Sequence, residues 1–289
     1  MSDFVLILGA TSSIARHVAA AFARRGRPLF LAARDAAELD RMAADLRIRY
    51  EVSVACAPFD AEDYAAHPHF FSEVLERTDG LAGVVLAFGY LGEQESAARD
   101  FAACQPILAR NFTGAVSILN LCAEYFERRA RGAGAAAEKF VDVTGEGGRG
   151  QRGERAERGE RGERGGRDGR AARGGFIVAV SSVAGDVGRQ SNYLYGAAKG
   201  GLNVYLQGLR NRLFASGVRV VTIKPGFVDT PMIYGRPGLF LVARPEGVGE
   251  RIAAAALRGP EVLYVPAFWR FVMLALRLLP DGLRKRLRL

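Results

Sequence analysis

Tyr195 and Lys199 stand four residues apart in the stretch SNYLYGAAKGGL. In a helix, this spacing places the two side chains on the same face. A free phenol has a pKa of about 10 and transfers its proton poorly near neutral pH, but a neighbouring ammonium group lowers that pKa. The pair therefore predicts a general acid, in which Tyr195 gives its proton to a substrate oxygen and Lys199 tunes it.

The rarity of lysine makes this pair informative. Only four of the 40 basic residues are lysines and nine residues are tyrosines, so chance would supply about 0.12 Tyr-x-x-x-Lys pairs. The structural alternative is a packed tyrosine beside a solvated lysine. Three further features bear on the choice: Asn111 in LARNFTGAV, Ser182 thirteen residues before Tyr195, and Pro225-Gly226 in IKPGFVDTPM.

The elements that must position these residues alternate along the chain. The expected strands cover residues 4–9, 29–33, 51–57, 83–88, 175–182, 218–226 and 261–266. The expected helices lie around residues 13–25, 36–47, 69–77, 96–130, 192–215 and 245–257. Apolar strands separated by helices predict a doubly wound parallel sheet, an α/β fold of the Rossmann type, with ligands at the carboxyl ends of the strands.

The turn after the first strand is a candidate phosphate site. Small residues let backbone N–H groups approach a pyrophosphate at the start of a helix, where the helix dipole favours an anion. Only one of the three glycines expected in such a turn is present, so an ordinary strand–helix turn stays the alternative. The candidate residues are Gly9, Thr11, Ser12, Ser13 and Ile14.

Two further strand ends carry residues that suit a dinucleotide. Arg34 follows the second strand in LAARD, where an arginine fits the 2′-phosphate of NADP(H). Asp35 comes next and keeps NAD(H) possible, because an acid there would bond the 2′-hydroxyl. Asp60 in PFDAED could meet the adenine amino group. Solvated surface side chains are the alternative for each.

Taken in order, these motifs closely resemble the short-chain dehydrogenase/reductase family. The resemblance implies that Tyr195 is the general acid, that Lys199 also holds the nicotinamide ribose, that Ser182 bonds the carbonyl oxygen and that Asn111 supports a proton-relay water. It further implies cofactor contacts from Ala87, Phe88, Gly89, Asn111, Tyr195, Lys199, Pro225, Gly226, Val228 and Thr230. Two departures stand out: Ser13 and Ala15 occupy usual glycine positions, and LAFGYLG, with Ala87, Phe88 and Gly89, stands where the family usually has Asn-Asn-Ala-Gly.

Four stretches are similar to one subgroup of this family, whose members reduce the 2-keto group of a polyprenyl-phosphoryl pentose. They are LAFGYLGEQE, FDAEDYAAHP, RNFTGAVSIL and EVLYVPAFWRFVMLALRLLP. The resemblance implies a lipid-linked phosphosugar substrate, an arabinose-forming role in cell-wall synthesis, a partner 2-oxidase and a homo-oligomer. Two alternatives stay open: a reductase of another ketone or 3-oxoacyl compound, and a non-catalytic dinucleotide-binding scaffold.

Charge and composition limit the kinds of partner to expect and indicate the domain boundaries. Most of the net charge of +9 falls within residues 145–175 and 270–289, so a general nucleic-acid surface is not expected. Arginine recurs every third residue from Arg149 to Arg173, and we expect residues 132–173 to be a disordered, low-complexity insertion. One NAD(P)-binding domain is expected from residues 1–131 and 174–266.

The C-terminal residues 267–289 predict a basic amphipathic helix. Its apolar stripe contains Trp269, Val272, Met273, Leu276 and Leu279, and is too short to span a bilayer. The stripe could lie on a membrane surface or pack on its own domain or on another subunit. The N-terminal residues lack a signal-peptide pattern, so we expect a cytoplasmic protein. Attachment to the inner face of the cell membrane is the alternative location. The three cysteines show no metal-ligand spacing, so no metal is expected.

Overall fold

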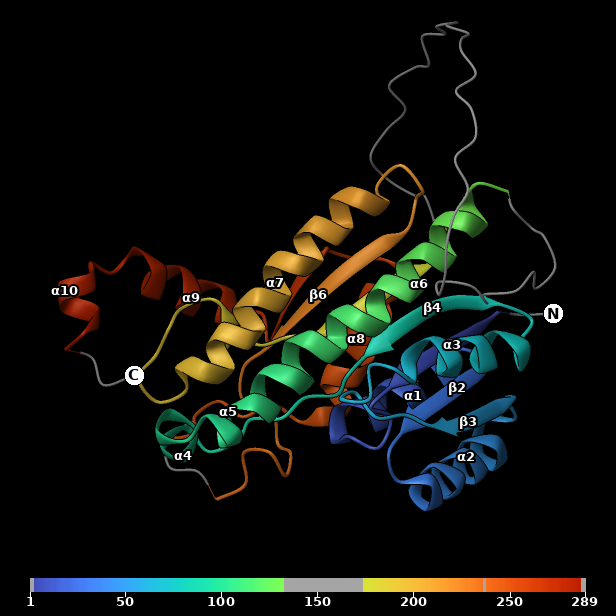
Figure 1. Ribbon diagram of the computed structural model, residues 1–289, viewed down its shortest axis with the longest axis horizontal. Coiled ribbons are helices and arrows are strands. Elements are labelled where there is room, and N and C mark those ends of the chain that lie inside the picture. Colours follow the sequence, from blue (N-terminus) through green and yellow to red (C-terminus); the bar gives the residue numbers. More distant parts are fainter. Residues whose placement is uncertain (1–2, 133–173, 236–237, 287–289) are drawn as a thin grey trace, which may run out of the picture.

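A computed structural model of the chain describes residues 3–132, 174–235 and 238–286. Seven parallel strands form one sheet in the order β3-β2-β1-β4-β5-β6-β7. Figure 1 labels β2, β3, β4 and β6 of this sheet. The strands are β1 (Phe4–Leu8), β2 (Leu29–Ala33), β3 (Val54–Pro58), β4 (Leu81–Leu86), β5 (Phe176–Val180), β6 (Arg219–Pro225) and β7 (Val262–Val265). The predicted doubly wound parallel sheet is confirmed.

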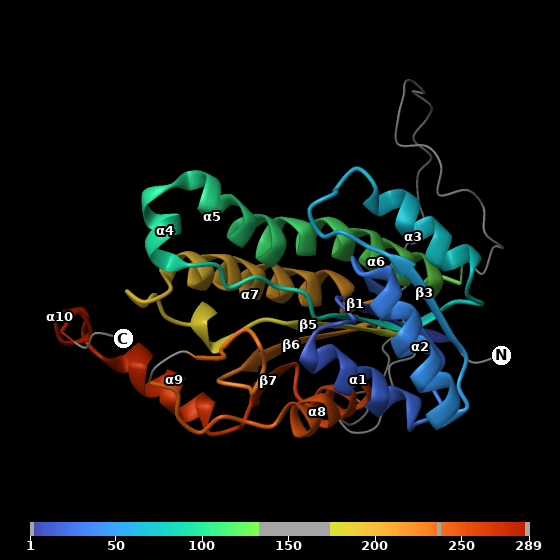
Figure 2. The same cartoon turned by 90° about the horizontal axis from the view of Figure 1, so that it is seen from below.

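Helices cover both faces of this sheet. Successive apolar side chains of a strand point to opposite faces, so each face needs its own layer of helices. Val5 and Ile7 face the cluster formed with α1 (Ser13–Ala23), α2 (Ala36–Tyr50) and α8 (Pro245–Leu257). Leu6 and Leu8 face the cluster formed with α3 (His67–Glu76), α6 (Gly114–Ala130) and α7 (Tyr193–Leu213). Figure 2 shows α1 and α8 on one side of the sheet and α6 and α7 on the other. The strand order reverses between β1 and β4, which opens a crevice at the carboxyl ends.

The single helix expected around residues 96–130 is divided into several segments. They are α4 (Gln94–Arg99), α5 (Phe101–Leu108), a π-helical turn (Ala109–Thr113) and α6. Asp100 makes the first break, because its backbone is extended and its carboxylate accepts a hydrogen bond from the Ala102 N–H at 2.9 Å. The π-helical turn holds Asn111, and such turns are frequent at functional sites.

The C-terminal apolar stripe packs against the rest of the chain. Trp269 and Met273 of α9 (Trp269–Leu278) are only 3% and 1% exposed, and they form a cluster with Val183 and Val187. Packing on the domain therefore accounts for this stripe, while contact of residues 267–289 with a membrane through another face stays a prediction. A short helix, α10 (Asp281–Arg284), follows.

Two remaining expectations concern the predicted insertion and the absence of a membrane-spanning helix. Residues 133–173, which make up almost all of the predicted insertion, lie outside the described part of the chain. Within the described residues, no helix has both the length and the apolar character needed to cross a bilayer.

Candidate active site

A groove runs along the carboxyl ends of the strands and consists of two adjoining cavities. The outer cavity has a volume of about 330 Å³ and lies beside β2 and β3, while the inner one has about 310 Å³ and lies beside β5 and β6. Both cavities are lined by Thr11, Ser12, Ala87, Phe88, Gly89 and Met232. The shared wall makes the two cavities adjoining parts of one groove.

The inner cavity brings together three of the four predicted catalytic residues. Tyr195 and Lys199, from α7, line it together with Ser182, which follows β5. The Lys199 Nζ lies 5.7 Å from the centre of the Tyr195 ring and donates a hydrogen bond of 3.0 Å to the Val180 carbonyl. Tyr195 is 8% exposed and Lys199 is 2% exposed, so both polar groups sit in a largely dry pocket.

Burial, and not the lysine, dominates the acidity of Tyr195. Loss of hydration raises the pKa of Tyr195 to about 12, while the Ser182 hydroxyl and Arg189 act in the lowering direction. Burial also lowers the pKa of Lys199 to about 8. The net shift of the Tyr195 pKa is therefore upward, opposite to the lowering expected from Lys199, because burial outweighs the groups that lower it.

Asn111 lies behind the wall of the groove and does not line it. Its Nδ2 donates to the carbonyls of Ile107, at 2.8 Å, and Tyr90, and its Oδ1 accepts from the Tyr90 N–H at 3.2 Å. A Cβ atom on Gly89 would come within 2.9 Å of Asn111 Oδ1 and 3.5 Å of Lys199 Nζ. The Asn111 side chain thus fixes the loop after β4, and its role toward a relay water stays a prediction.

The turn after β1 supports the predicted phosphate site in its backbone shape. Gly9 has a φ of +78°, and a Cβ atom there would lie 2.6 Å from the Phe88 nitrogen, so a side chain would not fit. Ser12 caps α1 by accepting from the Ala15 N–H, and donates to the Ala87 carbonyl at 3.3 Å. Ala15 is fully buried, so its methyl group points into the core and away from the groove.

The remaining predicted residues of the inner cavity lie where the sequence placed them. Ser13 and Ile14 come from the start of α1, and the others follow or end β6. This second group comprises Pro225, Gly226, Val228 and Thr230. A Cβ atom on Gly226 would lie 1.8 Å from the Trp269 indole nitrogen, so α9 packs directly behind this part of the groove.

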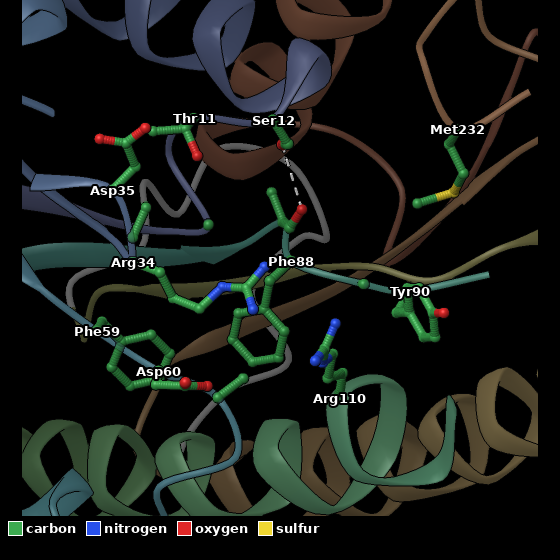
Figure 3. A pocket seen from close by; sticks show the side chains of 15 residues that line it. Thr11, Ser12, Arg34, Asp35, Phe59, Asp60, Phe88, Tyr90, Arg110 and Met232 are labelled. Carbon is green, nitrogen blue, oxygen red and sulfur yellow. Dashed lines mark hydrogen bonds between the residues drawn. The ribbon is translucent and has the colours of Figure 1, made fainter. Parts of the chain in front are cut away.

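In the outer cavity, the two candidate ribose-reading side chains diverge. Figure 3 shows the Arg34 side chain reaching across the cavity toward Phe88, while Asp35 points toward Thr11. The Asp35 carboxylate accepts from the Glu38 N–H at 2.9 Å and so caps α2. Within the described part of the chain, no hydrogen bond or ion pair joins the Arg34 side chain to a carboxylate.

Asp60 also lines the outer cavity, on a loop that a buried histidine supports. The Asp60 carboxylate accepts from the Glu62 N–H at 3.0 Å. His67 is 1% exposed, and its Nε2 and Nδ1 lie 2.9 Å from the Asp60 carbonyl and 2.8 Å from the Ser117 hydroxyl. Burial lowers the pKa of His67, which favours the neutral ring in this position.

Several residues of the groove had no signal in the sequence. The outer cavity is also lined by Phe59, Tyr90, Arg110 and Met232. Three of them lie in loops and Arg110 lies in the π-helical turn, next to the predicted residue Asn111. The Arg110 guanidinium lies 4.9 Å from the centre of the Tyr90 ring and is paired with Glu62. Figure 3 shows Arg110 pointing between Phe88 and Tyr90.

Comparison with known proteins identifies the family. A family profile described as short chain dehydrogenase matches residues 3–134 and 169–236. The chain belongs to the short-chain dehydrogenase family. An uncharacterized oxidoreductase of Mycobacterium tuberculosis H37Rv is 31% identical over 283 residues, covering 98% of this chain and 96% of the relative. One of Streptomyces coelicolor is 32% identical over 287 residues, covering 98% of this chain and 95% of the relative.

Solved structures of family members have the same fold. A short-chain dehydrogenase from Sphingobium yanoikuyae in complex with NADPH superposes with a TM-score of 0.68 at 23% identity, covering 99% of this chain and 94% of that one. A 3-oxoacyl-[acyl-carrier protein] reductase from Brucella melitensis in complex with NAD gives 0.70 at 18% identity, covering 94% and 98%. The predictions of the family and of an oxidoreductase are confirmed.

Proposed function

We propose that this short-chain dehydrogenase is an NAD(P)H-dependent ketoreductase. The observation that carries the proposal is the meeting of Tyr195, Ser182 and Lys199 in a cavity continuous with a groove over the β1–α1 turn. The groove fits a dinucleotide, because Gly9 brings backbone close to it and the N-terminus of α1 opens onto it. A bound reduced nicotinamide supplies the hydride for a ketone carbon.

The protein's own residues then complete the reduction. As the carbonyl carbon gains the hydride, the oxygen takes the electron pair of the C=O bond and accepts the Tyr195 proton, giving a secondary alcohol. A pKa of about 12 keeps Tyr195 protonated at neutral pH, as an acid must be. Ser182 donates a hydrogen bond to the same oxygen, and Lys199, whose pKa is about 8, is mostly charged at pH 7 and holds ribose hydroxyls.

We propose NADP(H) as the preferred cofactor, with NAD(H) as the alternative. Arg34 is exposed, reaches into the outer cavity and has no carboxylate partner within the described residues, whereas Asp35 is engaged in capping α2. An arginine in this position suits a 2′-phosphate through charge-assisted hydrogen bonds. The NADPH-bound and NAD-bound neighbours both support a nicotinamide dinucleotide.

Cofactor preference can be measured on an Arg34→Ala variant. Loss of a charge-assisted contact should lower kcat/KM for NADPH by about 10- to 100-fold. The value for NADH should change little, because that cofactor has no 2′-phosphate. Steady-state kinetics with both cofactors provides the internal control. Equal losses for NADPH and NADH would contradict the assignment.

We propose a polyprenyl-phosphoryl 2-keto-pentose as the substrate, as for decaprenylphosphoryl-2-keto-ribose reductase, which the chain resembles. The support is the likeness of four stretches, one of which contains Asn111, and an apolar segment after β6 that reaches the inner cavity through Pro231, Met232 and Ile233. Tyr234, Phe240 and Leu241 of this segment are exposed apolar side chains, which suits a lipid tail. A partner flavin oxidase would supply the ketone. A 3-oxoacyl or other ketone is the alternative.

We also propose that the protein rests on an anionic membrane from the cytoplasmic side. The outward face of α9 carries Phe271, Leu274 and Leu278, which are 70%, 53% and 75% exposed. Residues 267–289 hold six bases and one acid. Apolar side chains beside basic ones are typical of helices that lie in a bilayer interface.

The proposed reaction is tested by mixing the purified protein with an oxidase-generated polyprenyl-phosphoryl 2-keto-pentose and each reduced cofactor. We expect reduction of the ketone, and a loss of at least about 100-fold in kcat for Tyr195→Phe, since the acid is removed. Cofactor affinity should be retained. Tyr193→Phe is the matched control, because Tyr193 is on the same helix and 45% exposed. A Tyr195→Phe protein with parental turnover would end the proposal.

A further inference from the structure

Arg189 is a partly buried cation just before α7, the helix that carries Tyr195, and its charge has no partner among the described residues. Its Nε atom is buried and has no hydrogen-bond partner, and no ion pair joins its side chain to any described carboxylate. Burial lowers the pKa of Arg189, and the group that acts in the opposite direction is the Tyr195 phenol. An unpaired charge in a partly dry position is costly, so an anion from outside the chain would relieve a real penalty.

Arg189 belongs to the segment that delivers the catalytic tyrosine. The Asn192 N–H bonds to the Arg189 carbonyl at 3.2 Å, and Asn192 is the residue immediately before α7. Tyr195 lies in the first turn of that helix. The backbone therefore holds Arg189 close to the start of the helix that carries Tyr195. The charge of Arg189 also acts to lower the pKa of Tyr195, against the larger effect of burial.

Two more polar groups near this turn are buried without partners. Gln94, from α4, accepts a hydrogen bond from the Leu194 N–H at 3.1 Å, which places its amide at the start of α7. Among the residues that the structure describes, neither the Gln94 Nε2 nor the Asn192 Oδ1 has a hydrogen-bond partner. Buried polar atoms are almost always bonded in folded proteins, so three exceptions at one turn call for an explanation. The set offers two donors, which suit the oxygens of an anion, and one acceptor, which suits a hydroxyl of the sugar that carries it.

We propose that Arg189, assisted by Gln94 and Asn192, binds a phosphate group that the substrate carries next to its ketone. The inference rests on the proposed ketoreductase function and narrows its substrate class. In a 2-keto-pentosyl phosphate, the phosphate is on the carbon beside the ketone, so a short distance separates the group that Tyr195 protonates from the group that Arg189 pairs with. A 3-oxoacyl thioester has no charge at that position, and it leaves Arg189 unpaired.

Binding of ribose 1-phosphate to the NADPH-saturated full-length protein tests this subsite directly. Saturation with NADPH occupies the second phosphate site at Arg34, so calorimetry reports the substrate cavity alone. We expect Arg189→Gln to weaken ribose 1-phosphate binding by about 10- to 100-fold, which is typical for the loss of a charge-assisted contact. Arg189→Lys should lose part of this affinity, because the planar fork is absent. Ribose without phosphate should bind weakly and equally to all variants.

The control is Arg99→Gln, an exposed arginine on the same helix as Gln94. It should leave ribose 1-phosphate binding unchanged. Without ligand, Arg189→Gln should melt no lower than the parent, because it removes an unpaired charge; only the parent should gain thermal stability from ribose 1-phosphate. Parental binding by Arg189→Gln, or no binding by the parent, would overturn the phosphate subsite.

Turnover separates this inference from the proposed function. A parent protein that reduces a phosphate-free ketone, but neither binds ribose 1-phosphate nor favours a phosphorylated ketone, is a ketoreductase without this subsite. A parent that binds ribose 1-phosphate through Arg189 but reduces no 2-keto-pentosyl phosphate retains the subsite and loses the proposed substrate. In the expected result, Arg189→Gln raises KM for the phosphorylated ketone and changes KM for the phosphate-free ketone little.

Discussion

Lys199 must be both charged and buried, and these two properties oppose each other in a single residue. It must be charged to hold ribose hydroxyls, yet it is 2% exposed, and burial lowers its pKa from the ordinary 10.5 to about 8. Below pH 8 the folded state keeps an ammonium in a dry site. Between about pH 8 and 10.5 the folded state has released that proton while the unfolded state still holds it. The unfolded state then binds more protons, so this group makes the free energy of unfolding rise with pH.

This linkage predicts how a Lys199→Met variant compares with the parent. Methionine removes the titration, so the variant should have its largest relative stability below pH 8. The advantage should shrink steadily as the pH rises from 8 toward 10.5. Urea unfolding of the cofactor-free proteins at several pH values measures the difference. Titration of Tyr195 lowers the free energy of unfolding above about pH 10, because its pKa is raised in the folded state. This effect is present in both proteins and cancels in the difference between them.

Lys285→Met is the matched control, because Lys285 is an exposed lysine near the C-terminus. Its unfolding free energy should follow the parent at every pH. A Lys199→Met protein whose stability runs parallel to the parent across this range would show that Lys199 does not titrate early.

The residue scale also shows what the sequence could and could not reveal. Tyr195, Lys199 and Ser182 are recognisable because helical spacing and strand ends are local properties. Arg110 and Arg189 are single arginines in a chain full of them, and their surroundings come from segments distant in sequence, such as Gln94 for the turn after Arg189. The direction of the Tyr195 pKa shift was missed for the same reason, since burial depends on the whole fold.

At the scale of elements, strands were easier to foresee than breaks in helices. Seven apolar runs became seven strands, because a parallel sheet buried on both faces needs continuous apolar sequence. The long helix expected at 96–130 breaks at Asp100 and changes to a π-helical turn around Asn111. The second change depends on hydrogen bonds from Asn111 to the loop after β4, which no local pattern in the sequence announces.

Contact between α9 and the end of β6 predicts a strong interaction between two positions. A Cβ atom on Gly226 would lie 1.8 Å from the Trp269 indole nitrogen, so Gly226→Ala should destabilise the parent by about 1–3 kcal/mol through overpacking. Trp269→Ala alone should cost about 3–5 kcal/mol, because a 3% exposed ring is lost. In the Trp269→Ala background, Gly226→Ala should cost far less.

A double-mutant cycle by chemical unfolding measures this interaction. Gly247→Ala serves as the control, because a Cβ atom at Gly247, within α8, meets nothing within 4 Å. It should leave stability unchanged or slightly raised. Additive costs for Gly226→Ala and Trp269→Ala would show that α9 does not pack against Gly226 in solution.

At the scale of the whole molecule, α9 separates an inner apolar face from an outer one. A buried carboxylate fastens the helix: Asp186 pairs with Lys224 at 2.5 Å and Arg277 at 3.0 Å, and accepts from the Tyr264 hydroxyl at 2.7 Å. The sequence indicated an amphipathic helix, but it could not say which stripe the domain would cover, because several apolar residues occupy both sides. The stripe left outside is therefore the one available to a membrane.

Vesicle binding tests this assignment of faces. Replacing Phe271, Leu274 and Leu278 with serine should reduce sedimentation with phosphatidylglycerol vesicles more than ten-fold, because each apolar side chain buried in the interface contributes about 1.5–3 kcal/mol. Stability and turnover of a short-chain, water-soluble substrate should be unchanged, since all three side chains are exposed. Serine at Val204 and Phe214, which are 70% and 81% exposed on or beside α7, is the control and should leave vesicle binding intact. Phosphatidylcholine vesicles and high salt should both weaken binding of the parent, since its basic residues need an anionic surface. Equal sedimentation of the parent and the triple variant would mean that the outer face of α9 is not what meets the membrane.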